Sequence, residues 1–275
     1  MKHTRKWVAA LLASVVGVTL AGCGGGGGDA DSQPAIRFAA EGFWGGPDVN
    51  ASPVGLDTPP WNGPTGHFWG DPSSPGDHIG LVVLSTGDAW GVYTADDVVV
   101  GALHGTVTTS GGTGVAINNA QFFNMSNSGY SVSYTGAVAP RSQLDITNTD
   151  GTQHFVGVYN ASYDQAASLA QLAGNYTGTG GTSLGQNPGT HYSISISGSG
   201  NITMPPDAVG CSASGAVAPH TDKNVFDLSL RFSGANCALG NGAVVNGIAV
   251  LANDGHLLLE GATPGYGAMF IYVSN

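Results

Sequence analysis

The chain has 275 residues, of which only 9% are charged, and its formal net charge at pH 7 is −11. Three of its seven basic residues lie within the first 22 positions, so the remainder carries four basic and 18 acidic residues, a formal charge of −14. Such a surface repels phosphate backbones, and we expect no nucleic-acid partner. The length is enough for one large or two small domains.

The N-terminal segment has the layout of an export signal. Basic residues precede a run of 16 uncharged residues from Trp7 to Gly22, which is shorter than the about 20 residues that span a bilayer. The run ends in Leu20-Ala21-Gly22-Cys23, which resembles the lipobox of bacterial lipoproteins. The resemblance implies cleavage before Cys23, whose sulfur then carries a diacylglycerol and whose amino group is acylated, for example with palmitate.

We therefore expect a signal peptide over residues 1–22, and a lipidated cysteine with a disordered tether over residues 23–40. Several acyl chains make membrane attachment durable, and Gly24–Gly28 cannot bury apolar surface. The residue after the cysteine is Gly24, not the Asp that retains enterobacterial lipoproteins at the inner membrane. The resemblance thus favours the outer membrane, with the domains facing either the periplasm or the cell surface.

Beyond the tether the pattern predicts an all-β protein. Residues 226–233 alternate between apolar and polar side chains, which indicates a half-buried strand. Gly80–Tyr93 and Gly247–Gly261 each predict two strands joined by a turn. Short strands at spacings near ten residues predict two small antiparallel domains, each a barrel or a sandwich, over residues 41–162 and 174–275.

One segment between the two domains predicts a helix. Tyr163–Leu172 is rich in Ala, Leu and Gln and is followed by Gly174, so residues 163–173 are expected to form a helical connector. The halves also share a short motif. Gly-Ala-Val-Ala-Pro occurs at residues 136–140 and again at residues 215–219, which gives moderate support to an internal duplication.

Cysteine usage predicts one disulfide. With Cys23 lipidated, only Cys211 and Cys237 remain. In an oxidising exported compartment an isolated pair most simply forms a bridge, which would clasp the second domain.

A long Pro- and Gly-rich loop, from Gly45 to His78, is the most unusual feature of the first domain. Aromatic residues in and beside it bury large areas at low entropic cost, so they are candidates for stacking on a glycan or anchoring a protein partner: Trp44, Trp61, Phe68 and Trp69. The alternative is that these side chains fold back and plug one end of the first barrel.

The second half of this loop offers a set of possible metal ligands, but nothing in their spacing makes them converge, so we predict no metal site and no cofactor: His67, Asp71, Asp77 and His78. Nucleophile-elbow, phosphate-loop and zinc-protease motifs do not occur in the sequence, and the histidines of the strands are scattered singly. These observations favour a protein that is not an enzyme.

A broader resemblance covers most of the chain beyond Phe43. The order of Gly42–Gly46, the Gly80–Tyr93 hairpin and Tyr159–Gly180 resembles exported lipoproteins of Burkholderia and related proteobacteria. It implies small antiparallel β domains without an established activity. A more distant likeness is to the barrel domains of surface lipoproteins such as those that bind transferrin.

These observations predict an outer-membrane lipoprotein that acts as a binding or adhesion module for a glycan or a protein. Two alternatives remain open at this point. The first is an envelope structural protein with periplasmic partners, and the second is a hydrolase of envelope polymers.

Overall fold

The computed structural model describes residues 38–47, 77–95, 98–124, 129–151, 153–220, 223–252 and 255–274. These residues belong to one compact unit, Ile36–Asn275. Among them, no helix has the length and apolar character needed to cross a membrane. Cys23 and residues 24–37 of the predicted tether lie outside the described residues, so the lipidation hypothesis stays a prediction. The last three residues of that segment, 38–40, form a turn in which Ala40 is buried, so the tether does not extend to residue 40.

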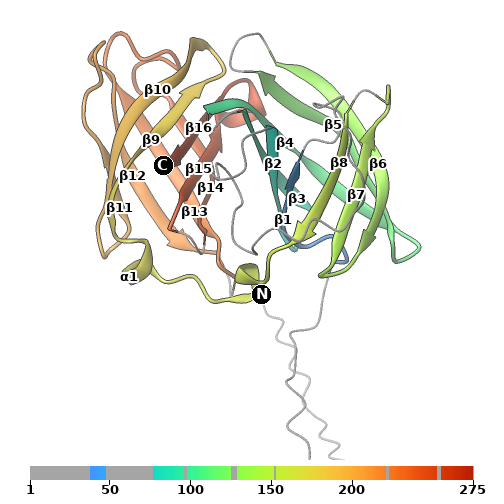
Figure 1. Ribbon diagram of the computed structural model, residues 1–275. Helices are drawn as coiled ribbons and strands as arrows, with labels where there is room; N and C mark the ends of the chain where they lie inside the picture. Colours follow the sequence, from blue (N-terminus) through green and yellow to red (C-terminus); the bar gives the residue numbers. More distant parts are fainter. Residues whose placement is uncertain are drawn as a thin grey trace, which may run out of the picture. The chain divides into compact units, whose positions relative to one another are not determined.

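The first half of the unit is a closed barrel of eight antiparallel strands (Figure 1). Each strand pairs with the next along the chain, and β8 closes the barrel by pairing with β1, where Trp44 lies opposite Tyr159. The strands are β1 (Gly42–Pro47), β2 (Asp77–Val83), β3 (Asp88–Ala95), β4 (Val98–Ser110), β5 (Gly114–Asn124), β6 (Tyr130–Ala139), β7 (Gln143–Asn148) and β8 (His154–Tyr159).

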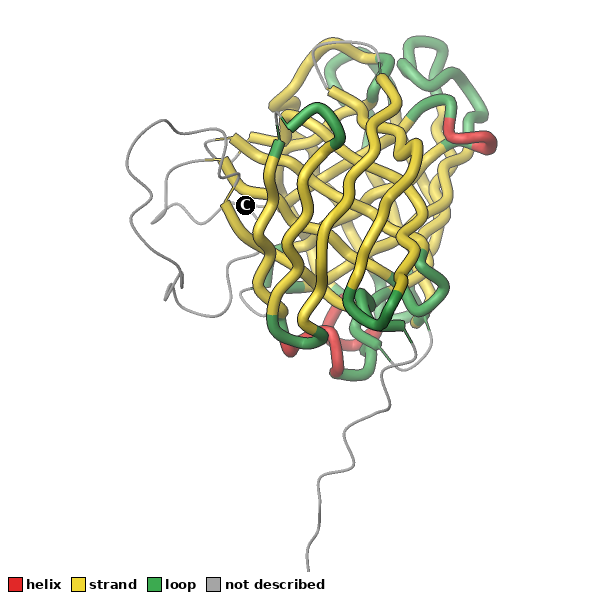
Figure 2. Tube along the Cα trace, turned by 90° about the vertical axis from the view of Figure 1, so that its right-hand side faces the viewer, coloured by secondary structure: helices red, strands yellow, loops and turns green. Residues whose placement is uncertain are grey.

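The second half repeats this architecture, and its last strand pairs with its first to close the barrel. The strands of the second barrel are β9 (Gly174–Thr182), β10 (Gly185–Ile196), β11 (Asn201–Met204), β12 (Ser212–Pro219), β13 (Phe226–Ser233), β14 (Val244–Leu251), β15 (Leu257–Ala262) and β16 (Met269–Ser274). In Figure 2, which is turned so that the first barrel faces the viewer, nearer and more distant strands of the unit run at an angle to one another, as the strand tilt of closed barrels requires. The all-β prediction is confirmed, and both domains are barrels.

The helical connector predicted over Tyr163–Leu172 is wrong. The chain forms a 3-10 turn, η1 (Ala161–Asp164), and a single helical turn, α1 (Leu169–Leu172), with extended backbone at Gln165 and Ser168 between them. Tertiary contacts override the weak helix propensity of so short a segment. The Tyr163 ring packs edge-on against Phe43 at 4.8 Å between ring centroids.

Asp164 fastens this connector to both barrels. Its carboxylate accepts hydrogen bonds from Arg141 of the first barrel, with Nη1 at 2.9 Å from Oδ2, and from Lys223 of the second, with Nζ at 3.0 Å from Oδ1. The hydroxyl of Tyr159 donates to Oδ2 at 2.9 Å. All three partners converge on one largely buried carboxylate, so the connector holds a fixed path despite its lack of a regular helix.

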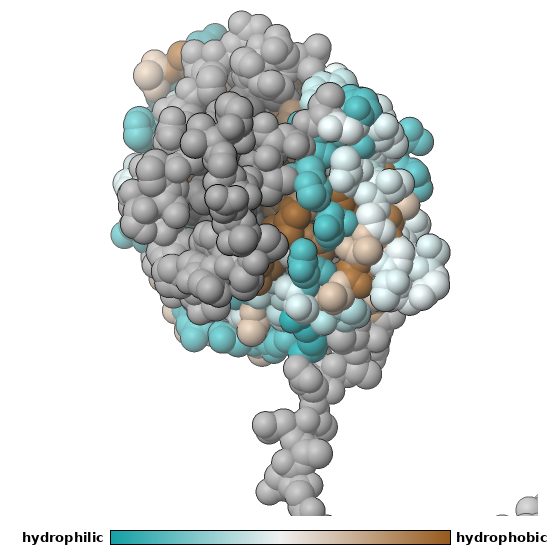
Figure 3. All heavy atoms as spheres, turned by 45° about the vertical axis from the view of Figure 1, so that its right-hand side comes forward, coloured by the Kyte–Doolittle hydropathy of each residue, from teal (hydrophilic) through white to brown (hydrophobic). Residues whose placement is uncertain are grey.

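Each barrel has an apolar interior made by alternate residues of its strands. In β13 the burial alternates strictly from Phe226 to Ser233, as the sequence predicts. The predicted hairpins are also present, as β2–β3 and β14–β15. On the face of the unit shown in Figure 3, the visible hydrophobic residues lie mainly in one limited area with hydrophilic residues beside it, as expected where polar side chains point outward.

A third apolar cluster lies between the barrels, and we call it the interbarrel layer. It is formed by outward-facing residues of both barrels: Phe43, Val82, Trp90, Val92 and Ala102 of the first, and Ile248, Val250, Leu258, Ala262, Ile271 and Val273 of the second. Because of this layer, the strands that meet there are buried on both faces. In β15 and β16 every residue is buried.

One carboxyl group, that of Glu260, is buried beside this layer. Glu260 is 0% exposed, and neither carboxyl oxygen makes a hydrogen bond of good geometry. Burial raises the pKa of Glu260 well above its ordinary value, and the negative charge of Asp88 raises it further. The backbone N–H groups of Gly91 and Leu103 lower this pKa, but they do not offset burial. Burial therefore favours the neutral, protonated form of Glu260 in the folded protein.

The raised pKa of Glu260 predicts a pH-dependent stability. Above the ordinary pKa of 4.5 the unfolded chain releases this proton while the folded chain keeps it, so the group lowers the free energy of unfolding by up to ~1.4 kcal/mol per pH unit. Glu260→Gln removes this term. Urea unfolding between pH 4 and pH 8 should show the stability of the variant, relative to wild type, rising with pH. Parallel curves for the two proteins would contradict a neutral Glu260.

Candidate functional site

The mouth of the second barrel is hollow and is the best-formed candidate site. Its cavity of about 440 Å³ lies within the range of small-molecule sites, and the mouths of β-barrels are common places for them. We call it the cup. Strands β9 to β13 and the loops after β11 and β13 supply its lining: Gly181, Thr182, Thr190, Tyr192, Met204, Asp207, Ala208, Val209, Cys211, Ser212, Phe232, Asn236, Ala238 and Leu239.

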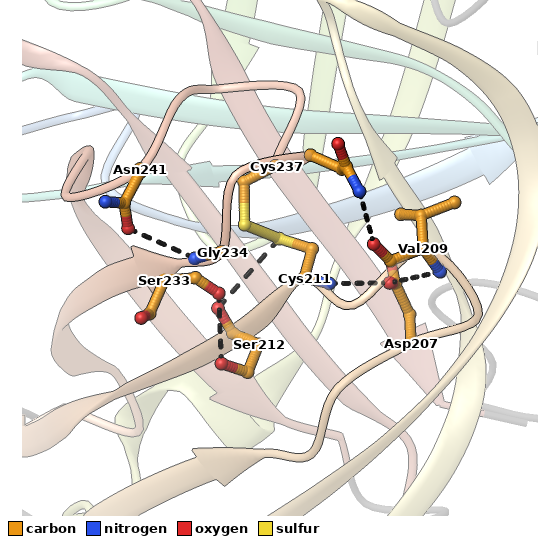
Figure 4. The surroundings of a disulfide bond; sticks show 9 residues. Asp207, Val209, Cys211, Ser212, Ser233, Gly234, Cys237 and Asn241 are labelled. Carbon is orange, nitrogen blue, oxygen red and sulfur yellow. Dashed lines mark hydrogen bonds between the residues drawn. A yellow bond between two sulfur atoms is a disulfide. The ribbon is translucent and has the colours of Figure 1, made fainter.

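A disulfide joins the two loops of the cup. Cys211 and Cys237 are bonded, with their Cα atoms 4.9 Å apart, so the predicted bridge is confirmed. Figure 4 shows the bridge between the loop that follows β11 and the loop that follows β13. The number of cysteines and the expected oxidising compartment predicted that these two pair, but not that the pair stands at the rim of a cavity.

Hydrogen bonds brace the same two loops. Oδ1 of Asp207 accepts from the backbone N–H groups of Val209, at 3.0 Å, and Cys211, at 2.9 Å (Figure 4). The side-chain amide of Asn236 donates to the carbonyl of Val209 at 3.0 Å, which links the loops a second time. The rim is therefore preorganised, and binding there would cost little ordering entropy.

The cup combines an apolar floor with polar walls. Met204 and Phe232 are each 4% exposed, and Phe232 packs edge-on against Phe270 with ring centroids 5.4 Å apart. Burial raises the pKa of the Tyr192 hydroxyl, and the carboxylate of Asp207 adds to this shift. That hydroxyl is thus a neutral hydrogen-bonding group. The surfaces suit a ligand with an apolar body and a polar edge.

Two hydroxyl groups and one side-chain amide on the walls of the cup could not be predicted from the sequence. Thr182, Ser212 and Asn236 come from different strands and loops and share no motif. Only Cys237, which directly follows Asn236 in the same loop, could have directed attention to that residue.

Trp44, a predicted ligand-binding residue, is a core residue. It lies in β1 with its side chain inside the first barrel, is 0% exposed, and donates its indole N–H to the carbonyl of Ala40 at 2.8 Å. Its ring packs edge-on against Tyr159 at 5.3 Å between ring centroids. A ligand could not stack on Trp44 without opening the barrel. Trp44 directly precedes the long loop, so the sequence pattern did not show that it belongs to a strand rather than to the loop.

The other three aromatic candidates, Trp61, Phe68 and Trp69, lie outside the described residues, so their binding role stays a prediction. The same holds for His67 and Asp71 as metal ligands, while Asp77 and His78 open β2. Within the ranges that the structure describes, no group of three or more His, Cys, Asp or Glu side chains is placed to hold a metal ion.

The cavity inside the first barrel is much smaller than the cup. The apolar interior of this barrel holds a cavity of about 50 Å³, lined among others by Ile79, Leu81, Phe122 and Phe155. A cavity of about 150 Å³ is known to hold one benzene molecule, so this interior is too small for a ring-sized ligand. The cup is the better candidate within the barrels.

Comparisons with known proteins give no match: no family model fits the sequence, and no curated protein or solved structure is similar to it. The candidate site therefore depends on its geometry alone.

The disulfide predicts a measurable loss of stability on removal. Cys211 and Cys237 are 26 residues apart, and closing such a loop stabilises a fold by roughly 3.5 kcal/mol in the chain-entropy model. We expect Cys211→Ala/Cys237→Ala to lower the free energy of unfolding by about 2–4 kcal/mol. Urea unfolding of the double variant and of the oxidised wild type checks this. Equal urea midpoints for the two proteins would show that the bridge does not stabilise the fold.

Proposed function

We propose that this protein is a lipid-anchored, non-catalytic binding protein whose second barrel holds a small ligand in the cup. The single observation that carries the proposal is the cup itself, a braced cavity of about 440 Å³ with an apolar floor and polar walls. The ligand class that fits is a small amphipathic molecule, because Met204 and Phe232 offer apolar surface while Thr182 and Ser212 offer hydroxyls.

The lining supports binding rather than chemistry. Three of its residues with catalytic potential are engaged: Cys211 is in the disulfide, Asp207 accepts two backbone N–H groups through Oδ1, and the hydroxyl of Ser212 donates to the carbonyl of Ser233. Histidine is not among the cup residues that the structure describes. A nucleophile with an adjacent base, which covalent catalysis requires, is thus not formed in the described part of the cup.

The N-terminal sequence supports the anchor and the compartment. The export signal, Cys23 and the Gly-rich tether together favour an outer-membrane lipoprotein, and the bridge Cys211–Cys237 suits an oxidising compartment. In this proposal the lipid keeps the cup near the membrane, where amphipathic molecules concentrate.

Filling the cup should abolish binding. Ala238 lines the cup and is exposed, whereas Ala235 is exposed on the same loop but is not part of the lining. With the neutral apolar dye N-phenyl-1-naphthylamine as the probe, we expect saturable fluorescence enhancement by the wild type. Ala238→Trp should weaken it at least tenfold because the indole occupies the cavity, and Ala235→Trp should leave it unchanged. Equal effects of the two variants would place the dye elsewhere and remove the support for the cup.

Loss of Cys23 should release the protein from the membrane. In cells that express the full chain, we expect Cys23→Ser to move the protein from the membrane fraction to the soluble fraction, since the acyl chains supply the attachment. The control is Cys211→Ser/Cys237→Ser, which should stay with the membrane. Mass spectrometry of the wild-type N-terminus should find the acyl chains on Cys23. An unmodified Cys23 in membrane-bound protein would refute the anchor.

A further inference from the structure

A second hollow, distinct from the cup, lies between the two barrels. It has a volume of about 650 Å³, and we call it the interbarrel groove. Strands β4 and β5 of the first barrel form one wall, and the turns after β9 and β15 of the second barrel form the other. Its lining is His104, Gly105, Thr106, Asn118, Asn119, Gln121, Phe123, Gly129, Ser183, Leu184, Gly265 and Gly267.

One β-bulge in β5 shapes the wall of the first barrel. The β4–β5 register shifts between His104 and Val107, and the β5–β6 register shifts between Ile117 and Ala120, because β5 has one extra residue there relative to each neighbour. Bulges re-aim side chains and recur next to functional sites. Here the bulge exposes Asn118 and Asn119 in succession, where regular alternation would bury one of them.

Asn119 adopts an uncommon backbone conformation within this bulge. Its φ is +51°, in the left-handed region that non-glycine residues seldom adopt. Its N–H donates to Oγ of Ser133 at 2.9 Å, which holds the bulge in place. Strain of this kind persists where the surroundings fix it and is frequent at ligand sites.

The inner end of this wall is fixed by a hydrogen-bonded group of three side chains. Nε2 of His104 lies 2.8 Å from Oδ1 of Asp88, and the indole N–H of Trp90 donates to Oδ2 of Asp88 at 2.8 Å. The rings of Trp90 and His104 pack with centroids 4.1 Å apart. His104 therefore presents a fixed surface to the groove.

Apart from His104, whose ring is held by Asp88, the polar side chains of the lining are uncharged amides and hydroxyls. Among the lining residues described, the amides of Asn118, Asn119 and Gln121 and the hydroxyls of Thr106 and Ser183 supply donors and acceptors, and none is Asp, Glu, Lys or Arg. A side-chain amide offers two donors and an acceptor, which matches the neighbouring hydroxyls of a sugar. An ionised ligand would be desolvated there without an opposite charge to pair with.

The opposite wall exposes bare backbone at two glycines. A Cβ atom at Gly265 would meet nothing within 4 Å, and one at Gly267 would meet only the hydroxyl of Thr263, at 3.9 Å. A ligand can thus approach the main chain closely. Gly267 has φ −73° and ψ −23°, which any residue adopts, so a side chain can be added there without strain.

From these features we propose that the interbarrel groove binds a neutral saccharide, with the amides of Asn118, Asn119 and Gln121 as its hydrogen-bonding groups. This site goes beyond the proposed function, since it shares no lining residue with the cup and takes a different class of ligand.

The test measures binding of neutral oligosaccharides of glucose and of N-acetylglucosamine, and of sulfated and sialylated oligosaccharides for comparison, to the purified full chain by isothermal titration calorimetry. We expect at least one neutral oligosaccharide to bind more tightly than every charged one. Asn118→Ala should weaken it about fivefold to tenfold, the loss expected for one hydrogen bond. Gly267→Leu should abolish binding by filling the groove.

Asn201→Ala is the matched control, because Asn201 is exposed on β11 of the second barrel and its side chain bonds only to the nearby Ser199. Its binding should equal that of the wild type, and circular dichroism should show the same fold for all variants. The proposal is overturned if no neutral oligosaccharide binds, if charged ones bind more tightly, or if Gly267→Leu binds as well as the control.

Discussion

Burial of one apolar layer between two closed barrels is the constraint on which the rest of the structure depends. A barrel that stands alone needs apolar residues only on the inside of its strands. Here the strands that meet the other barrel need them on both faces, and β15 and β16 are buried at every position. The connector, fixed through Asp164 to Arg141 and Lys223, also joins the two barrels.

The periodic part of this arrangement could be predicted from the sequence. Strict alternation in Phe226–Ser233 and the two hairpins gave the strands and their pairing, because period-2 burial is a local property. The interbarrel layer could not be predicted in the same way. A continuous apolar run such as Leu257–Leu259 fits a buried strand, but it does not say which element covers its second face.

Two local patterns proved misleading for physical reasons. The weak helix propensity of Tyr163–Leu172 is outweighed by tertiary packing, in particular by the contact between the rings of Tyr163 and Phe43. The repeated Gly-Ala-Val-Ala-Pro motif lies in the sixth strand of the first barrel and the fourth of the second. In both places a Cβ on the glycine would lie 1.9 Å from a carbonyl oxygen of the next strand. A shared packing demand, rather than equivalent positions in an in-order duplication, accounts for the motif.

The cup and the interbarrel groove are built on one short segment. Thr182 lines the cup at the end of β9, and the next two residues, Ser183 and Leu184, line the groove. The N–H of Met269 donates to Oγ of Ser183 at 2.9 Å, which ties this segment to β16. The segment at which the second barrel closes therefore also sets the distance between the cup and the interbarrel groove.

Barrel closure also imposes an order on biosynthesis. The first barrel is complete once β8 has emerged, but the second must wait for β16, since β9 pairs with that last strand. Until then the second barrel does not cover the outer face of the first, with Phe43, Val82 and Trp90. A chain made from its N-terminus therefore passes through a stage in which a finished first barrel is not yet packed against its neighbour. Chaperones that recognise exposed apolar side chains can engage the protein at that stage.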